Sequence, residues 1–488
     1  PYEEGDHKGT PLRRGRPQGY APTFPLFPQE IMLDATPTTL VERKALRVNP
    51  AKTCQPIGAM YSALGIHGCL PHSHGSQGCC SYHRSHLTRH FREPIMAATS
   101  SFTEGTAVFG GGANLRQAFK TIYQLYDPPV IAVTTTCLSE TIGDDIPTIV
   151  REARESGVIP EGKTVIHANT PSYVGCHITG WSNMTASMVK YLSESSGESR
   201  NQVNLIPGYV EPSDTRELKQ MLATWGIDAV TFPDTSDVVD TPQTGHFQMY
   251  PQGGTTVEAL KTTGDSLATI ALGPEASSQA AIALEAKCQV PHHILDLPIG
   301  VAATDRLVQT LMDVTGTQPT DEIVNARGRL VDVMTDMQSY LYEKRVAIAG
   351  DPDQVVPLVE MLVTCGAKPV YVITGAESKY FRDRCGELLG ESVPEAVIRD
   401  NEDLFYLHQL LKQEPVDLLI SNVYGKYIAR AEDVPFVRYG WPILDRVGHS
   451  YFPTLGYGGS LHLLCTIINT LLDRKDREDP DESFELVL

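Results

Sequence analysis

Three of the ten cysteines stand at chain breaks or at the end of a strand, where a thiol can meet a ligand. Cys54 precedes Pro56 and Gly58 in "AKTCQPIGA", Cys79 ends "GSQGC", and Cys137 closes the apolar run "IAVTTTC". A thiol at a helix start feels the positive end of the helix dipole, which favours the thiolate. Thiolates are the ligands of soft metals and of iron–sulfur clusters. Their separations match no continuous motif, so only the fold could bring these three together.

Other uses of the same residue types stay open at this point. Cys69, His72 and His74 are zinc-type ligands, although no fourth ligand stands at a standard spacing. Cys79 and His83 could share a helical face as nucleophile and base, but no orienting acid accompanies them. The cysteines form no C-x-x-C pair and are not spaced like a secreted disulfide framework. Free cysteine also packs as a small hydrophobe, the use that we expect for Cys288, Cys365, Cys385 and Cys465.

Length and composition restrict the class of protein. The 488 residues are 41% hydrophobic and 20% charged, which suits about three globular domains. The formal net charge of -19 argues against a nucleic-acid partner. Since the sequence contains neither a run of about 18 apolar residues nor a signal-type start, we expect no membrane contact and a cytoplasmic location.

The elements that must position the cysteines alternate between short Val/Ile-rich runs and amphipathic stretches of helical period. Examples of such runs are "PVIAVTTTC", "KTVIHANTPS" and "KPVYVITG". This alternation predicts an α/β protein with doubly wound, Rossmann-like parallel sheets. In such sheets ligands bind beyond the carboxyl ends of the strands. Residues 345–375 form the clearest strand–helix–strand unit, and it lacks the G-x-G-x-x-G sequence of a dinucleotide site.

The same pattern suggests three doubly wound domains and an extended N-terminal arm. We expect the Pro- and Gly-rich arm over residues 1–45 and a first domain, carrying the three cysteines, over 46–215. A second domain with an interface helix covers 216–343, and a third, with a C-terminal helix and tail, covers 344–488.

Several longer segments carry a resemblance to a known family. They are "NPAKTCQPIGA", "HGSQGC", "RHFREP", "TEGTAVFGGGANL", "TTCLSETIGDD" and "NTPSYVGCHITGW", and the likeness continues through "RGRLVDVMTD", "GDPD" and "LDRVGH". In this order they resemble the β subunits of the nitrogenase component 1 family, of the molybdenum–iron type. The resemblance covers essentially everything after the arm.

The resemblance implies that Cys54, Cys79 and Cys137 are thiolate ligands of the P-cluster, an [8Fe-7S] centre shared with an α subunit. Ser172 matches a serine whose oxygen joins an iron when the cluster is oxidised. A hard alkoxide favours more oxidised iron, and its formation couples electron loss to proton loss. From the residues alone, Ser172 would be read as a turn residue beside Pro171.

The resemblance also implies a cation site between two β subunits. Asp332 and Asp336 stand four apart on an expected helix, so their carboxylates share a face. The family places a cation there, with Glu93 and the backbone oxygen of Arg92 from the other copy. All-oxygen ligation suits calcium or iron. Without the resemblance, a solvated acidic face would be the simpler interpretation.

The function implied is electron relay within an α2β2 heterotetramer, an ATP-dependent nitrogenase that reduces N2 to ammonia. Phe109 matches an aromatic that meets the iron protein at docking, although a core residue at a turn is the alternative. The resemblance places the iron–molybdenum cofactor in the α subunit and no catalytic residue on this chain. Vanadium or iron-only nitrogenase β subunits, a cofactor-assembly scaffold and an unrelated α/β binding protein remain alternatives. Cys80, Cys176 and His83 depart from the usual family pattern, and their roles stay open.

Overall fold

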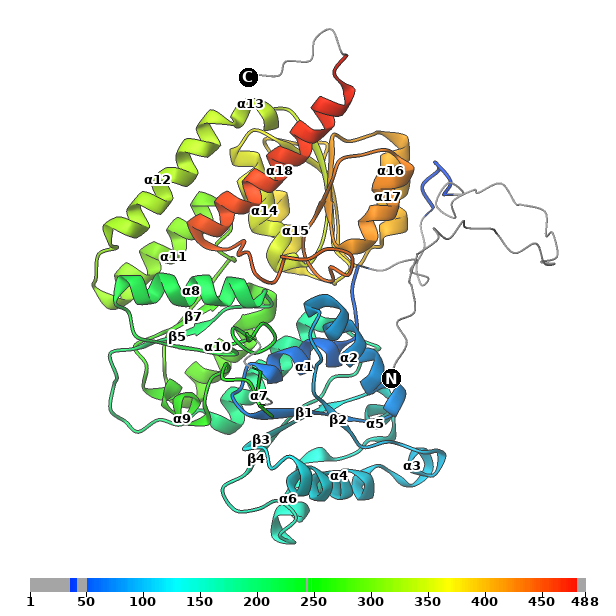
Figure 1. The fold of residues 1–488 in the computed structure, drawn as a ribbon, viewed down its shortest axis with the longest axis vertical. Helices are drawn as coiled ribbons and strands as arrows, with labels where there is room; N and C mark the ends of the chain where they lie inside the picture. The colour runs from blue at the N-terminus through cyan, green and yellow to red at the C-terminus, as the bar shows by residue number, and fades with distance from the viewer. Residues whose placement is uncertain (1–35, 42–50, 243–244, 247, 481–488) are drawn as a thin grey trace, which may run out of the picture.

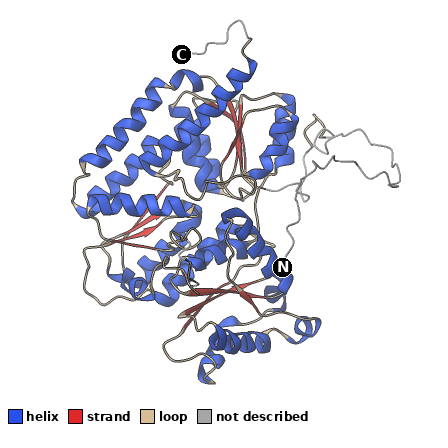
Figure 2. Ribbon diagram, in the orientation of Figure 1, coloured by secondary structure: helices blue, strands red, loops and turns tan. Residues whose placement is uncertain are grey.

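The structure, a computed structural model, describes residues 36–41, 51–242, 245–246 and 248–480. Most of the predicted arm, residues 1–45, lies outside the described residues, and 36–41 contain no helix. Three separate sheets follow, and all their strand pairings are parallel. Helices cover both faces of the sheets (Figure 2). The predicted α/β class with three doubly wound sheets is therefore confirmed. None of the described helices combines the length and apolar character needed to cross a membrane.

The first unit holds a sheet of strand order β2-β1-β3-β4. One face packs against α1 and α7 through residues such as Ala59 and Met184, and the other against α4 and α6 through Phe119 and Ile149. Its elements are α1 (Gln55–Leu64), β1 (Cys69–His74), α2 (Gln77–Phe91), β2 (Ala98–Thr99), α3 (Glu104–Phe109), α4 (Gly112–Leu125), β3 (Val130–Thr135), α5 (Cys137–Ile142), α6 (Ile146–Glu155), β4 (Thr164–Ala168) and α7 (His177–Leu192).

The second unit repeats this order as β6-β5-β7-β8. Strand β5 precedes the domain boundary predicted at 215/216, yet it pairs with the strands of this second sheet. The elements are β5 (Val203–Ile206), α8 (Pro212–Trp225), β6 (Ala229–Thr231), α9 (Val257–Lys261), η1 (Thr262–Asp265), β7 (Thr269–Leu272), α10 (Pro274–Cys288), β8 (His292–Leu295), α11 (Gly300–Thr315), α12 (Asp321–Asp336) and α13 (Gln338–Leu341).

The third unit has a sheet of order β11-β10-β9-β12-β13. Its first strand, helix and second strand lie where the strand–helix–strand unit was predicted. The elements are β9 (Arg345–Ala349), α14 (Pro352–Thr364), β10 (Lys368–Ile373), α15 (Lys379–Leu389), β11 (Val397–Arg399), α16 (Leu404–Gln413), β12 (Leu418–Ser421), η2 (Val423–Gly425), α17 (Lys426–Ala431), β13 (Phe436–Arg438) and the long α18 (Gly456–Glu478).

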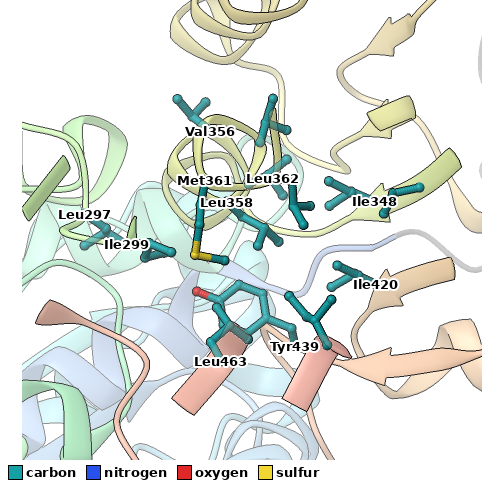
Figure 3. Packing of buried hydrophobic residues seen from close by; sticks show 14 of the residues in the cluster. Leu297, Ile299, Ile348, Val356, Leu358, Met361, Leu362, Ile420, Tyr439 and Leu463 are labelled. Atoms are coloured by element: carbon teal, nitrogen blue, oxygen red, sulfur yellow. The ribbon is translucent and has the colours of Figure 1, made fainter. Parts of the chain in front are cut away.

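The largest core cluster joins the second and third units. Leu297 and Ile299, which follow β8, lie beside Met361 of α14, and Leu463 of α18 closes the cluster from the other side (Figure 3). Each is at most 3% exposed. Burying one such side chain stabilises a fold by roughly 1.5–3 kcal/mol, so this cluster fixes how the two units sit together.

A buried polar contact ties the first unit to the third. His177, the first residue of α7, accepts at Nδ1 from the Thr53 backbone N–H at 3.4 Å and donates from Nε2 to Asp351 at 3.1 Å. Asp351 is the N-cap residue of α14. The segment leading into Cys54 is thereby anchored to both units (Figure 1 shows α1, α7 and α14).

Candidate metal centre

Cys79 and Cys137 follow the two neighbouring strands, β1 and β3, at which the strand order of the first sheet reverses. Strands β1 and β3 are neighbours, and the chain leaves their carboxyl ends toward opposite sides of the sheet. This is where open α/β sheets bind ligands. The segments that follow touch, because a Cβ added to Gly75 would lie 2.1 Å from the Thr136 hydroxyl. Gly75 leads to Cys79 and Thr136 to Cys137, so the sheet brings both thiols to one edge.

Each thiol also stands at the start of a helix. Cys54 is the N-cap residue of α1, and Cys137 is the first residue of α5. Cys79 lies in the first turn of α2, after Ser76, whose hydroxyl accepts from the Gly78 N–H at 3.2 Å. Cys137 is exposed, whereas Cys54 and Cys79 are half-buried. The thiols therefore line an open edge, where a second chain could contribute further ligands.

Ser172 reaches the same edge from the loop after β4. Gln55, the residue after Cys54, holds this loop by donating from Nε2 to the carbonyls of Pro171 (2.9 Å) and Val174 (2.7 Å). Its Oε1 accepts from Asn183 of α7 at 3.3 Å. With Gln55 only 2% exposed, these are protected hydrogen bonds, and they fix the serine loop to the start of α1.

The helices α1 and α7 meet through two glycines at backbone contact distance. A Cβ added to Gly58 would lie 1.8 Å from the carbonyl oxygen of His177, and one added to Gly180 would lie 1.8 Å from that of Gln55. No side chain fits between the helices at these points. The distance between the Cys54 helix and the Ser172 loop is thus set by direct backbone contact.

The electrostatic environment links the four side chains. Burial raises the pKa of Cys54, a hydrogen bond with Ser172 lowers it, and nearby Cys137 raises it. Burial likewise raises the pKa of Cys79, with further increases from Cys137 and Cys54. Without a cation the cluster of thiols therefore resists ionisation, and a bound metal would reverse this by stabilising thiolate.

The spacing of the thiols suits a multi-metal cluster more than a single ion. Among the described residues, only His90, Glu211 and His449 bring three metal-type donor atoms within 4.8 Å of one another. Cys54, Cys79 and Cys137 interact electrostatically but lie too far apart to share one ion. Several soft sulfur donors that do not converge on one ion suit an iron–sulfur group.

Comparisons with known proteins show the family of this chain. The family described as Nitrogenase component 1 type Oxidoreductase matches residues 54–472. This chain belongs to that family. A relative from Clostridium pasteurianum, named nitrogenase molybdenum-iron protein beta chain, is 54% identical over 457 residues, which cover 93% of this chain and 100% of the relative. The protein of the same name from Azotobacter vinelandii is 37% identical over 90% of this chain and 86% of its own length.

Solved structures of the nitrogenase component 1 family agree with the fold. A structure described as nitrogenase Cp1 at pH 6.5 superposes with a TM-score of 0.93 at 54% identity, covering 94% of this chain and 100% of the other. A second chain, described as nitrogenase Cp1 at pH 5, gives a TM-score of 0.67 at 17% identity, covering 91% of this chain and 93% of the other. The second likeness concerns the fold alone.

The alternative sites considered for the cysteines find no support in the described residues. His72 and His74 both contact the Ser100 hydroxyl at 2.8 Å, whereas Cys69 is buried in a hydrophobic cluster. No zinc triad forms there. All ten cysteines are free, and no hydrogen bond joins Cys79 to His83. His83 is buried, and burial lowers its pKa to about 4.

The two cysteines that depart from the family pattern have other partners. The Cys80 thiol faces the Ala98 carbonyl at 3.6 Å. Cys176 is the N-cap residue of α7, where its sulfur accepts from the backbone N–H of Thr179. Burial and the nearby Asp351 together raise the pKa of Cys176 to about 11. Both thiols therefore have local structural roles.

Phe109 is an exposed residue and not a core residue at a turn. It ends α3 with 90% of its surface exposed, beside Val108 at 75%. An apolar pair this exposed is typical of a contact surface. The predicted docking role is consistent with this exposure and stays a prediction.

The four residues predicted for the inter-subunit cation lie on different elements. Arg92 and Glu93 follow α2, whereas Asp332 and Asp336 are exposed on α12 (Figure 1). Neither aspartate forms an ion pair with another described residue. This placement is compatible with a site completed by a second copy.

Two features of the site escaped prediction. Gln55 holds the serine loop, and its signal in the sequence is an amide directly after Cys54 at the head of a largely apolar helix.

The group of His90, Glu211 and His449 was also missed. His90 accepts from the Ile443 N–H at Nδ1, so its Nε2 carries a hydrogen, which it donates to Glu211 at 2.7 Å. This ring has no free lone pair for a metal, and the group is a hydrogen-bonded junction.

Proposed function

We propose that this chain is the β subunit of a nitrogenase molybdenum–iron protein and relays electrons toward the reduction of N2. Cys54, Cys79 and Cys137 would hold an [8Fe-7S] P-cluster, with Ser172 as a fourth donor. The observation that supports the proposal is that three thiols, far apart in sequence, each stand at a helix start and influence one another, with the Ser172 hydroxyl beside Cys54. The names of the relatives support the molybdenum type.

When bound, such a cluster supplies storage and release of electrons. The chain's own residues position the donors: backbone contacts at Gly58 and Gly180 fix the helices, and Gln55 fixes the Ser172 loop. Ser172 lies beside the Cys54 thiol and can hold or release a proton at Oγ. Release would create a hard oxygen donor, which favours more oxidised iron. Burial and hydrogen bonds around the sulfurs would tune the potential.

The proposal includes three protein partners. An α subunit would cover the edge where Cys137 is exposed, complete the ligand set and carry the iron–molybdenum cofactor. A second β subunit would meet α12, with calcium or iron between Asp332, Asp336, Glu93 and the Arg92 carbonyl. The nitrogenase iron protein would dock transiently at Phe109 and hydrolyse ATP itself. No catalytic residue is assigned to this chain.

The test compares neighbouring cysteines in the purified complex with the native α subunit. We expect Cys79→Ala to lose cluster iron and the electron paramagnetic resonance signal seen after oxidation, and to abolish acetylene reduction. Cys80→Ala is the matched control, because its thiol lies on the same helix but faces a carbonyl. We expect it to keep all three properties. Normal acetylene reduction by Cys79→Ala would overturn the assignment.

Metal analysis of the partner's cofactor separates the related functions. Molybdenum is expected; vanadium, or iron alone, would assign the chain to one of the alternative nitrogenases. A cofactor-assembly scaffold would bind iron without reducing acetylene when supplied with iron protein and ATP.

A further inference from the structure

The loop after Phe109 rests on the Asp144 carboxylate and the Phe102 ring. The backbone N–H of Gly111 donates to both oxygens of Asp144, at 2.9 and 3.1 Å. The Asp144 side chain is only 7% exposed. Gly110, between Phe109 and Gly111, has a φ of +87°, and a Cβ on Gly111 would lie 2.6 Å from Asp144 Oδ2. The glycines therefore allow the loop to rest directly on the carboxylate.

Asp144 begins a buried hydrogen-bond chain whose direction can be assigned. A carboxylate only accepts, so His74, at 3.1 Å, donates to it from Nε2. His74 Nδ1 then accepts from the Ser100 hydroxyl at 2.8 Å, and Ser100 accepts from His72 Nε2 at 2.8 Å. Burial lowers the pKa of His72 to about 3. It also lowers the pKa of His74, against the opposing effect of Asp144. Both rings are therefore neutral near pH 7.

One branch of this chain reaches Cys137. Asp144 follows α5, the helix that begins at Cys137, and its backbone N–H donates to the Ser139 carbonyl at 3.2 Å. The helix is six residues long, with Thr136 capping its start through Ser139. A displacement of Asp144 would therefore act on a single short turn that carries the thiol.

The other branch reaches Cys79. His74 is the last residue of β1, and Gly75 and the N-cap residue Ser76 connect it to α2, where Cys79 lies in the first turn. Gly75 rests on Thr136, the residue before Cys137. The two thiol segments thus support each other, and both are attached to the carboxylate beneath the Phe109 loop.

We propose that Asp144 is a positioning residue that transmits docking at Phe109 to the backbone segments holding Cys79 and Cys137. The inference rests on the proposed function and adds a route to it. A partner pressing on Phe109 displaces Gly110 and Gly111. Asp144 follows the loop, because leaving it would break buried hydrogen bonds to the carboxylate, which are costly to leave unmade. Its motion then shifts the thiol segments and changes the rate of electron delivery.

The decisive variant is Asp144→Asn, studied in the assembled complex with the α subunit. Asparagine keeps the size but offers one accepting oxygen where Gly111 and His74 need two. Ser100→Ala is a second, milder variant, which removes the other partner of the His74 ring and leaves the Gly111 contact intact. Glu104→Gln is the matched control, because Glu104 is an exposed acid on α3, the helix of Phe109, outside the chain of contacts.

The first readout is amide hydrogen exchange with and without iron protein, trapped by a transition-state analogue of ATP hydrolysis. In the native complex, docking should change exchange at residues 109–112, 76–79 and 137–139. In Asp144→Asn the change at 109–112 should persist while the changes at 76–79 and 137–139 disappear. Ser100→Ala should weaken the change at 76–79, and Glu104→Gln should behave as the native complex. Transmission to 76–79 and 137–139 that is unaltered in Asp144→Asn would overturn the inference.

The second readout separates docking from delivery. For Asp144→Asn we expect the maximal iron-protein-dependent rate to fall at least about fivefold, with the half-saturating iron-protein concentration within about twofold of native. A higher half-saturating concentration at an unchanged maximal rate would mean that Asp144 only shapes the docking surface, against the inference. Absence of cluster iron in the native complex would instead refute the proposed function, so the two failures are distinguishable.

Discussion

Replacing Gly180 by alanine tests whether backbone contact sets the spacing of the metal donors. The new Cβ would lie 1.8 Å from the Gln55 carbonyl oxygen and 2.5 Å from its carbon. Both atoms belong to the backbone of a fully packed helix, so no side-chain rotation relieves the clash. Helices α1 and α7 must separate by at least about 1.2 Å for the contact with oxygen to reach 3.0 Å, a distance below which real Cβ atoms are essentially never found.

The expected cost follows from this displacement. Overpacking a core typically costs about 1–3 kcal/mol, and a clash that only helix separation relieves belongs at the upper end. About 3 kcal/mol lowers the midpoint of thermal unfolding by roughly 6–12 °C for units of this size. Since Cys54 precedes Gln55 and Ser172 follows the strand leading to α7, the same separation would move these two donors apart. Cluster iron should fall together with stability.

The assay compares thermal unfolding at one scan rate, iron content and the electron paramagnetic resonance signal of the oxidised complex. Gly386→Ala is the matched control, because this exposed glycine lies within α15 and a Cβ there meets nothing within 4 Å. It should stabilise the helix by about 0.5–1 kcal/mol and leave the iron content unchanged. If Gly180→Ala unfolded within 2 °C of the native complex and kept its full iron, the argument from backbone contact would be refuted.

Three further predictions concern other parts of the molecule. Gln55→Leu should release the Ser172 loop at a cost of about 2–3 kcal/mol, which would be measured as faster amide exchange at residues 171–175. Asn183→Ala removes only one of the three contacts of Gln55 and should accelerate this exchange less. Burial raises the pKa of Asp353 from 3.8 to about 8. Because the native state then holds a proton that the unfolded chain releases, the free energy of unfolding should fall as pH rises from about 4 to 8. In calorimetric scans, Asp353→Asn should reduce this dependence on pH. Asp332→Asn should weaken association of two αβ pairs, measured by sedimentation with and without a chelator; equal dissociation of native and variant complexes would contradict the cation site.

The sequence predicts the regular parts of the fold well. Runs rich in Val and Ile became β3, β9 and β10, because strands buried on both faces leave a continuous apolar signal. Strand β1 gives no such apolar signal, since it contains Pro71, His72, Ser73 and His74. All of these are buried, and the two histidines are satisfied by Ser100. Polar groups that pair with one another inside a core leave no hydrophobic pattern to detect.

The candidate site could be predicted from the sequence only in part. The ends of parallel strands share one edge of a sheet, so Cys137 and Ser172 could be expected near each other from their positions after two strands. Residue type alone could not separate Cys54 from Cys176, since both are helix-start cysteines. The difference is in their partners: Cys176 faces its own helix in a capping box, whereas Cys54 faces Ser172. Such long-range partners depend on how the helices and loops pack. The family resemblance carries information on that packing, whereas the residues next to each cysteine do not.

The contacts that hold the donors are of a different kind from those around the docking loop. Cys54 and the Ser172 loop are fixed by backbone resting on backbone at Gly58 and Gly180, where little can move without a clash, whereas Gly75 beside the other two thiols rests on the Thr136 side chain. Phe109 itself is exposed, and the loop after it rests on the Asp144 carboxylate and the Phe102 ring. A force applied there cannot be absorbed by the packed helices α1 and α7. It can be absorbed by α5, a single short helix whose capped start carries Cys137. We therefore expect docking to move Cys137 more than Cys54.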